Sequence, residues 1–411
     1  MKKFRLLSLL LCVCLLLQCI FVPVSATETA DEQNDALTET IVQKTAEVPF
    51  GSRCIQNGCR TIEGMVPLGG TDRKLETAQG VFLFETNTGT VVYSYNPDLK
   101  LAPGSLAKIV TAIVALQYCE LEDIVTVKTG IKGRLPNSTL DIDLTGDEQI
   151  SVEALLHALL MTSANDAAVA LAEHIAGNSQ GYVTLMNNWV KQIGCTNTEF
   201  SSVHGVDGAQ SVTTARDMVK IIRAAIQNEE FAEIFGATEY TIGATNMSEQ
   251  RAKLQTTNYM RDNSIIQDFY DGRITGGMQS YEASSAACLA VTADSGGLSY
   301  IAVVLGCTRT FSSEDSWKPI IYGNFNEMED LLKFGFNNFK INRIVYEGMS
   351  LSQFSVAGGE CNAVGQAMVD IDSVVPVNAQ MKNLTMSFDL GKEGLVAPIS
   401  AGEQIGTVSI S

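Results

Sequence analysis

Two polar residues in the segment PGSLAKIV have types and spacing that suit nucleophilic catalysis. Ser105 and Lys108 stand three residues apart at the start of a predicted helix, so their side chains share one face of that helix. A serine hydroxyl is a poor nucleophile unless a neighbouring base takes its proton, and a lysine can act as that base when burial or another cation lowers its pKa. An N-cap serine followed by a surface lysine would give the same spacing, and this interpretation is favoured when the segment is taken alone.

The segment MTSANDAAVA carries a second polar pair at the entry of another predicted helix. Ser163 and Asn165 lie two residues apart in it. Ser163 could relay a proton, and Asn165 could hold a substrate carbonyl or orient the lysine. Because serine, asparagine and aspartate all cap helices well, an ordinary capped helix is the simpler interpretation of this segment by itself.

The segment DGRITGG predicts a strand with small residues at one end. Thr275 could bind a carboxylate there, and Gly276 would let backbone and substrate approach closely. The N–H of Gly277 could then act as a second donor to an oxyanion, beside the N–H of Ser105 at its helix N-terminus. A glycine-rich hairpin accounts equally for this segment when nothing else is considered.

Taken in this order, the three segments resemble the active-site motifs of a known family. S-x-x-K, S-x-N and K-T-G, in this order, form the active-site set of the penicillin-binding proteins and class A β-lactamases. The chain resembles the low-molecular-mass members, which are serine-type D-alanyl-D-alanine carboxypeptidases. The resemblance runs from about residue 75 to the end and includes VFLFETNTGTVVYSYNP, DLTGDEQISVEALLHALL and LVAPISAGEQIGTVSI.

The resemblance implies a serine acyl-enzyme mechanism that uses no metal or cofactor. The implied substrate is a peptidoglycan stem peptide ending in two D-alanines, and β-lactam antibiotics would be covalent inhibitors. Ser105 would be the nucleophile, Lys108 the general base and Ser163 the proton relay. Substrate contacts would come from Asn165, Ile274, Thr275, Gly276 and Gly277.

The third segment departs from the family at one position. Members usually read DGIKTG, whereas this chain reads DGRITG, so Ile274 stands where a lysine is expected. Arg273 lies one residue earlier, on the opposite face of a regular strand, and would need a register slip or a bulge to replace that lysine. The loss predicts either a slow carboxypeptidase or an inert relative that binds wall peptides or another wall protein.

The surrounding pattern predicts the elements that position these residues. A hairpin is expected over 80–97, and two strands over 284–307. Helices are expected over 105–120, 150–163, 164–177 and 214–227, with a further helix ending the stretch 317–339. Together with the resemblance, these elements indicate an α+β fold of the β-lactamase/transpeptidase-like type, with an antiparallel sheet and a helical cluster over 75–342. Short alternating strands with glycine turns predict a small all-β domain over 343–411.

The N-terminal part predicts export from the cytoplasm. Residues 1–26 have a basic start, an apolar run and a small-residue end, which is typical of a secretory signal peptide. An uncleaved membrane anchor or a lipoprotein at Cys19 is a weaker alternative. Residues 27–74 are acidic at first and are expected to be a disordered spacer. Cys54 and Cys59 could form a local disulfide or remain two free thiols.

Charge and the C-terminal end bear on partners. The formal net charge of -18 argues against nucleic acid, since phosphate binding needs a cationic face. Family members often finish with an amphipathic helix that lies on the membrane, whereas this sequence stops at GTVSIS, which alternates like a strand. Peripheral membrane association therefore stays open. The expected location is extracytoplasmic, at the cell wall or the membrane surface.

Overall fold

The computed structural model describes residues 53–54, 77–136, 140–206, 210–264, 266–282, 286–311, 319–378, 386–390 and 394–410. The predicted signal peptide, Cys59 and almost all of the predicted spacer lie outside these residues. Within the spacer range, β1 (Arg53–Cys54) pairs in parallel with β3. Among the described residues, no helix combines the length and the apolar character that crossing a bilayer requires.

A mostly antiparallel sheet organises the larger part of the chain, with the strand order β1-β3-β2-β10-β9-β8. The predicted hairpin is confirmed as β2 (Gly80–Glu85) and β3 (Thr90–Tyr95), and the two later strands as β9 (Ala286–Ser295) and β10 (Leu298–Cys307). Gly296 and Gly297 both have positive φ in the turn between β9 and β10, a conformation open mainly to glycine. β8 (Ile274–Glu282) pairs with β9 and is the last strand of this order among the described residues.

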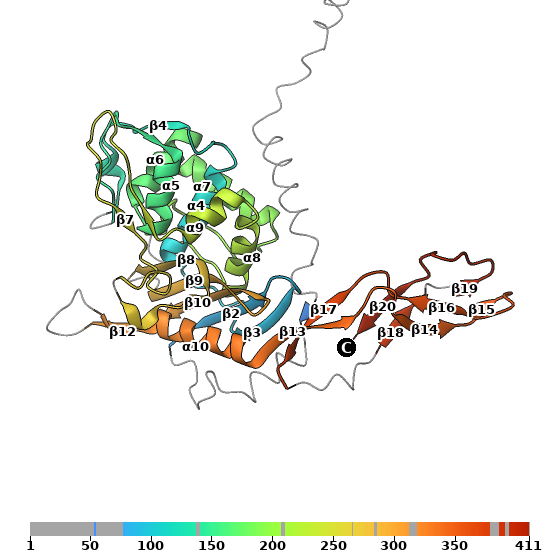
Figure 1. Cartoon of the computed structure of the whole chain (residues 1–411). Coiled ribbons are helices and arrows are strands. Elements are labelled where there is room, and N and C mark those ends of the chain that lie inside the picture. The colour runs from blue at the N-terminus through green and yellow to red at the C-terminus, as the bar shows by residue number, and fades with distance from the viewer. Residues whose placement is uncertain are drawn as a thin grey trace, which may run out of the picture. The chain divides into compact units, whose positions relative to one another are not determined.

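One face of the sheet is covered by a helical cluster (Figure 1). The short helix η1 (Gly104–Leu106) leads directly into α4, every residue of which is buried, so α4 lies inside the cluster. The predicted helices are confirmed, and two further helices, α7 and α9, were not foreseen. The cluster comprises α4 (Ala107–Ala115), α5 (Val152–Met161), α6 (Asn165–Ala176), α7 (Ser179–Gln192), α8 (Ala215–Ala225) and α9 (Glu229–Gly236).

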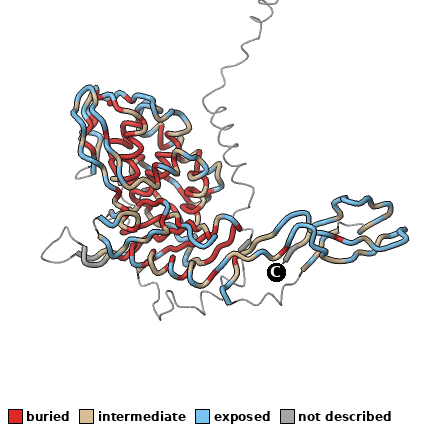
Figure 2. The backbone as a smooth tube through the Cα atoms, in the orientation of Figure 1, coloured by how far each residue is buried: buried red, intermediate tan, exposed pale blue. Residues whose placement is uncertain are grey.

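The other face of the sheet packs on α10 (Gly323–Asn338). Because successive strand residues point to opposite faces, β2 divides its side chains between two cores. Phe82 and Phe84 join the helical cluster, whereas Val81 and Leu83 join the core under α10. In Figure 2 much of the backbone of the helical cluster and of the sheet is coloured as buried. The predicted α+β fold with an antiparallel sheet and a helical cluster is confirmed.

The segment after α10 contains only strands among its described residues, as the sequence predicts. β13 (Phe339–Val345) pairs with β17 (Ile371–Pro376), and the boundary predicted between residues 342 and 343 falls inside β13. Few side chains are fully buried there, Val345 and Val374 among them. The other pairs are β14 (Ser350–Phe354) with β16 (Ala363–Gln366), β15 (Val356–Ala357) with β19 (Leu395–Val396), and β18 (Met386–Asp389) with β20 (Thr407–Ile410).

Short elements complete the connections of the larger part. They are β4 (Ile124–Thr126), η2 (Ile131–Arg134), β5 (Gln149–Ser151), β6 (Glu239–Tyr240), β7 (Leu254–Gln255), η3 (Gln267–Phe269), β11 (Arg309–Phe311) and β12 (Pro319–Tyr322).

Candidate active site

Ser105 and Lys108 meet at the start of α4. The ammonium Nζ of Lys108 donates to Ser105 Oγ at 3.1 Å and to the carbonyl oxygen of His204 at 2.7 Å. Lys108 is 0% exposed and Ser105 is 5% exposed. A surface lysine beside an N-cap serine is therefore excluded, because burying a lysine without a purpose-built environment is costly. The pair has the contact that proton transfer from the serine would need.

The loop that holds His204 packs very closely against η1, the turn that carries Ser105. A Cβ atom at Gly205 would stand 1.9 Å from the carbonyl oxygen of Gly104, and the φ of Gly205 is +78°. Only glycine permits this approach. Thr111 in α4 also donates to the carbonyl oxygen of Val203 at 2.6 Å. The segment 203–205 therefore forms a second support for Lys108, and the sequence motifs alone did not indicate it.

Ser163 and Asn165 lie at the turn between α5 and α6, both nearly buried. Ser163 has a φ of +61°, a left-handed conformation that is rare outside glycine and common at functional sites. The side-chain Nδ2 of Asn165 donates to the carbonyl oxygen of Leu140 at 3.1 Å. Its Oδ1 is buried and has no hydrogen-bond partner among the described residues. Asn165 thus presents an acceptor rather than a donor.

Asp166 fastens the segment around Leu140 to the start of α6. Its carboxylate accepts hydrogen bonds from the backbone N–H groups of Ile142, at 3.0 Å, and Leu144, at 3.0 Å. Burial raises the pKa of Asp166 to about 6, against the opposing effect of these backbone donors. Because Asn165 bonds to the same segment, Asp166 helps to set the position of the Asn165 amide.

β8 presents Ser280, and not the predicted Thr-Gly pair, to the nucleophile. The backbone N–H of Ser105 donates to Ser280 Oγ at 2.8 Å, and Ser280 is buried. Gly277 lies three residues earlier on β8, which is about 10 Å along a strand at ~3.3 Å per residue. The prediction that Gly277 N–H is the second oxyanion donor beside Ser105 is therefore not supported by the geometry.

Thr275, Gly276 and Gly277 instead meet the end of α9 and the next strand. A Cβ atom at Gly276 would stand 2.7 Å from Cδ1 of Phe235, so the glycine is needed for helix and strand to pack. Thr275 is exposed, and its Oγ1 donates to Thr292 Oγ1 at 2.8 Å. A Cβ atom at Gly277 would stand 2.6 Å from Nδ2 of Asn258. Close packing thus explains both glycines.

Ile274 and Arg273 both face the core on the α10 side. Ile274 is 1% exposed and belongs to the same cluster as Met260 and Phe325. Arg273 lies in the turn before β8, so strand alternation does not apply to it. The register shift between Ile274 and Gly276 marks a bulge that releases Ile274 from the alternation of the later β8 residues. Arg273 pairs with Asp271 at 2.7 Å, and its guanidinium lies 4.5 Å from the ring centroid of Phe336 in α10. Arg273 is therefore engaged away from Ser105 and does not replace the expected lysine.

The strand β8 forms one wall of the candidate site, called the strand wall below, and it carries no positively charged side chain. β8 reads ITGGMQSYE and contains neither lysine nor arginine. Met278 lies two residues before Ser280, so it points to the same face, and it packs in the helical-cluster core. The side chains that β8 turns toward this face near Ser105 are thus a thioether and a hydroxyl.

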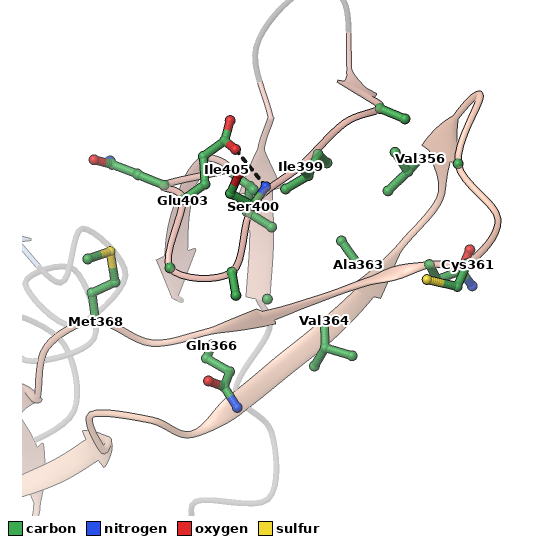
Figure 3. A pocket seen from close by; sticks show the side chains of 18 of the residues that line it. Val356, Cys361, Ala363, Val364, Gln366, Met368, Ile399, Ser400, Glu403 and Ile405 are labelled. Carbon is green, nitrogen blue, oxygen red and sulfur yellow. Dashed lines mark hydrogen bonds between the residues drawn. The ribbon is translucent and has the colours of Figure 1, made fainter.

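A hollow of about 650 Å³ lies elsewhere, in the C-terminal all-β segment. Figure 3 shows the side chains that line it, Cys361, Val364 and Met368 among them, and the hydrogen bond from Ser400 N to Glu403 Oε2 at 2.9 Å. None of the predicted site residues lines this hollow. We therefore place the candidate chemistry at Ser105, which contacts the buried Lys108 and lies just before α4, the helix on which α5 and α6 pack.

Comparison with known proteins assigns the chain to a family. The family model described as D-alanyl-D-alanine carboxypeptidase matches residues 71–309. The chain belongs to this family. Membership confirms the resemblance seen in the sequence and identifies the chain as a serine-type carboxypeptidase.

Named relatives support the family assignment over most of the chain. The D-alanyl-D-alanine carboxypeptidase DacC of Escherichia coli is 32% identical over 343 residues, which cover 80% of this chain and 79% of the relative. DacA of Haemophilus influenzae is 31% identical and covers 81% of this chain and 80% of its own. Penicillin-binding protein 5 of Haemophilus influenzae matches with a TM-score of 0.64 and 27% identity over 82% of this carboxypeptidase and 92% of that chain.

A more distant structure shows the fold alone. The carboxypeptidase DacD of Francisella tularensis has a TM-score of 0.66 at 20% identity, covering 83% of this chain and 90% of its own. The penicillin-binding-protein fold of this carboxypeptidase thus persists where little sequence likeness remains.

Proposed function

We propose that this carboxypeptidase removes the last D-alanine from peptidoglycan stem peptides through an acyl-enzyme on Ser105. The observation that carries the proposal is the fully buried Lys108 Nζ, 3.1 Å from Ser105 Oγ. In its neutral form the amine accepts the Ser105 proton while Oγ bonds to the carbonyl carbon between the two D-alanines. The family of the chain supports this substrate class.

The remaining steps return the proton and release the acyl group. As the peptide C–N bond breaks, the proton taken by Lys108 passes to the leaving amine, with Ser163 as the relay. Water then attacks the ester carbonyl and gives a proton to Lys108. As the bond between the carbonyl carbon and Ser105 Oγ breaks, Lys108 passes this proton to Oγ and the shortened peptide leaves with a new carboxyl group. Asn165 Oδ1, which is buried and has no hydrogen-bond partner among the described residues, is suited to accept from a substrate backbone N–H.

Because β8 carries no cation, we expect this reaction to be slow. The substrate carries a terminal carboxylate, and β8 offers it neither lysine nor arginine. Ile274 lies in the core under α10 and Arg273 is bound to Asp271, so neither side chain supplies the missing cation. Loss of one charged contact to the reacting complex commonly costs ~100-fold or more in rate.

The missing cation on β8 also suggests a second candidate function. The chain would then be an inert relative that keeps the fold and binds wall peptides or another wall protein as a scaffold. The absence of lysine and arginine from β8 favours this alternative, whereas the contact between Lys108 and Ser105 favours the enzyme.

The proposed location is outside the cytoplasm, at the cell wall or the membrane surface. The signal-like residues 1–26 motivate the proposal and lie outside the described residues. Penicillin-type β-lactams are the proposed covalent inhibitors, because they acylate a serine that attacks the D-Ala-D-Ala bond.

A fluorescent penicillin tests the nucleophile directly. The chain without residues 1–26 is incubated with the probe, and the covalent label is mapped by peptide mass spectrometry. We expect label on Ser105 in the wild type and none in Ser105→Ala. Release of D-alanine from a synthetic peptide ending in L-Lys-D-Ala-D-Ala then measures the proposed reaction.

The outcomes separate the two candidate functions. Label together with D-alanine release supports the carboxypeptidase. A folded wild type that shows neither, but binds purified peptidoglycan in a sedimentation assay, would support the scaffold role instead.

A further inference from the structure

We propose that the hydroxyl of Ser280 occupies the oxyanion position at Ser105, so that every acyl donor must displace it. This inference rests on the proposed function, because an oxyanion forms only if Ser105 attacks a carbonyl. The Ser280 hydroxyl thus blocks the oxyanion position, and its displacement sets the rate of acylation. Neither the family motifs nor the sequence spacing points to this residue.

The backbone N–H of Ser105 is the natural donor for an oxyanion. It lies in η1, just before α4, and the first N–H groups of a helix have no acceptor within the helix. Such a donor, attached to the nucleophile itself, stabilises the negative oxygen that forms when Oγ attacks. In this structure the N–H donates to Ser280 Oγ at 2.8 Å. An oxyanion would need this same distance from the nitrogen.

Ser280 is held in place by the sheet rather than by a loop. It pairs with Cys288 of β9 inside a ladder that runs without interruption from Gly276 to Glu282. Cys288 Sγ lies 4.0 Å from the carbonyl oxygen of Ala102. Ser280 and its partner Cys288 therefore both contact the segment that leads into α4. Ser280 is also 1% exposed, which leaves little room for other side-chain rotamers.

The contact has a direct consequence for catalysis. A substrate carbonyl oxygen and Ser280 Oγ cannot occupy one site 2.8 Å from the same nitrogen. Acylation therefore requires Ser280 to rotate away and to give up this buried hydrogen bond before the N–H can stabilise the oxyanion. A residue without a hydroxyl at position 280 would remove this competing acceptor from the Ser105 N–H.

The test compares acylation by a fluorescent penicillin in the wild type, Ser280→Ala and Ser280→Gly. Removing a single oxyanion donor typically slows an enzyme by ~100-fold or more, so we expect the two variants to label roughly 10- to 100-fold faster than the wild type. Ser352→Ala, in β14 of the C-terminal segment, is the matched control and should label at the wild-type rate. Hydrogen exchange of the Ser105 amide, read by mass spectrometry of a short peptide, should be at least about tenfold faster in Ser280→Ala.

Each outcome bears on a separate claim. If the wild type labels at Ser105 but the folded variants label no faster, the inference about Ser280 fails while the proposed function stands. If no variant labels, both fail. An unchanged exchange rate of the Ser105 amide in Ser280→Ala would also overturn the inference, because it would show that Ser280 does not protect this N–H.

Discussion

The two walls of the candidate site differ in how well they match the family. The helical wall, made by the start of α4 and the turn between α5 and α6, holds Lys108 in contact with Ser105 and places Asn165 at the start of α6. The strand wall, made by β8, contains no cation and turns Ser280 against the nucleophile N–H. The helical wall thus keeps the proposed nucleophile and base in contact, whereas the strand wall lacks the lysine that the family motif would supply.

The difference lies in what each wall depends on. The polar residues of the helical wall are paired over short spacings, and helical geometry brings Ser105 and Lys108 onto one face. The strand wall depends on register, and one bulge or a shift along the strand changes which side chains face the site. We therefore expect substitutions in β8 to change function more readily than they change the fold.

Replacing Lys108 by methionine would remove the proposed general base from the helical wall and should have the largest effect on the rate of penicillin labelling. A general base commonly contributes ~100- to 10,000-fold, so we expect penicillin labelling to slow by roughly 1,000-fold. The buried volume stays nearly the same, and thermal unfolding should confirm a folded protein. Labelling within about tenfold of the wild type would show that Lys108 is not the base.

Ile274→Lys asks whether the missing family lysine can simply be restored. Ile274 is buried among apolar residues under α10, so the ammonium would lose its hydration there. We expect the free energy of unfolding in urea to fall by about 3 kcal/mol or more, with no gain in labelling.

Thr275→Lys is the matched control, since Thr275 is exposed one residue away and should tolerate a lysine. Faster labelling in a stable Ile274→Lys protein would contradict the observed strand register.

The pH dependence of stability tests the support of the helical wall. The pKa of Asp166 is raised from 3.8 to about 6, so the folded state binds its proton more tightly than the unfolded state. The contribution of Asp166 is then fully present below pH 4 and is lost as the pH rises through about 6. We expect the stability of the wild type relative to Asp166→Asn to fall by roughly 2 kcal/mol between pH 4 and pH 7.

Urea unfolding of both proteins across this pH range is the measurement. A relative stability that instead rises with pH would show that the backbone donors of Ile142 and Leu144 outweigh the burial of the carboxylate.

Arg273→Gln should give the smallest effect and sharpens the description of the strand wall. The ion pair with Asp271 is partly exposed, and such pairs contribute about 1 kcal/mol or less. We expect a small loss of stability and penicillin labelling at the wild-type rate. A strong loss of labelling would mean that Arg273 turns toward the site after all and serves as the missing cation.

Much of this protein could be predicted from its sequence because the signals are local. The hairpin of β2 and β3 and the helices α4, α5, α6 and α8 follow from periodicity and turn residues, and the spacing of Ser105 and Lys108 led to their contact. The helices α7 and α9 were missed. The loop at Gly205 was missed as a support for Lys108, since its value depends on a partner about a hundred residues away in the chain.

The family, the main helices and strands other than α7 and α9, and the proximity of Ser105 to Lys108 all follow from the sequence, as does the absence of lysine and arginine from the strand 274–282. Only the tertiary structure decided which residues of that strand meet the nucleophile. The bulge after Ile274, the packing of Gly276 on Phe235 and the stacking of Arg273 on Phe336 all depend on elements distant in sequence. Their combined effect sends Ile274 and Arg273 toward α10 and leaves Ser280 against Ser105, because strand register is set by what packs on both faces of a sheet.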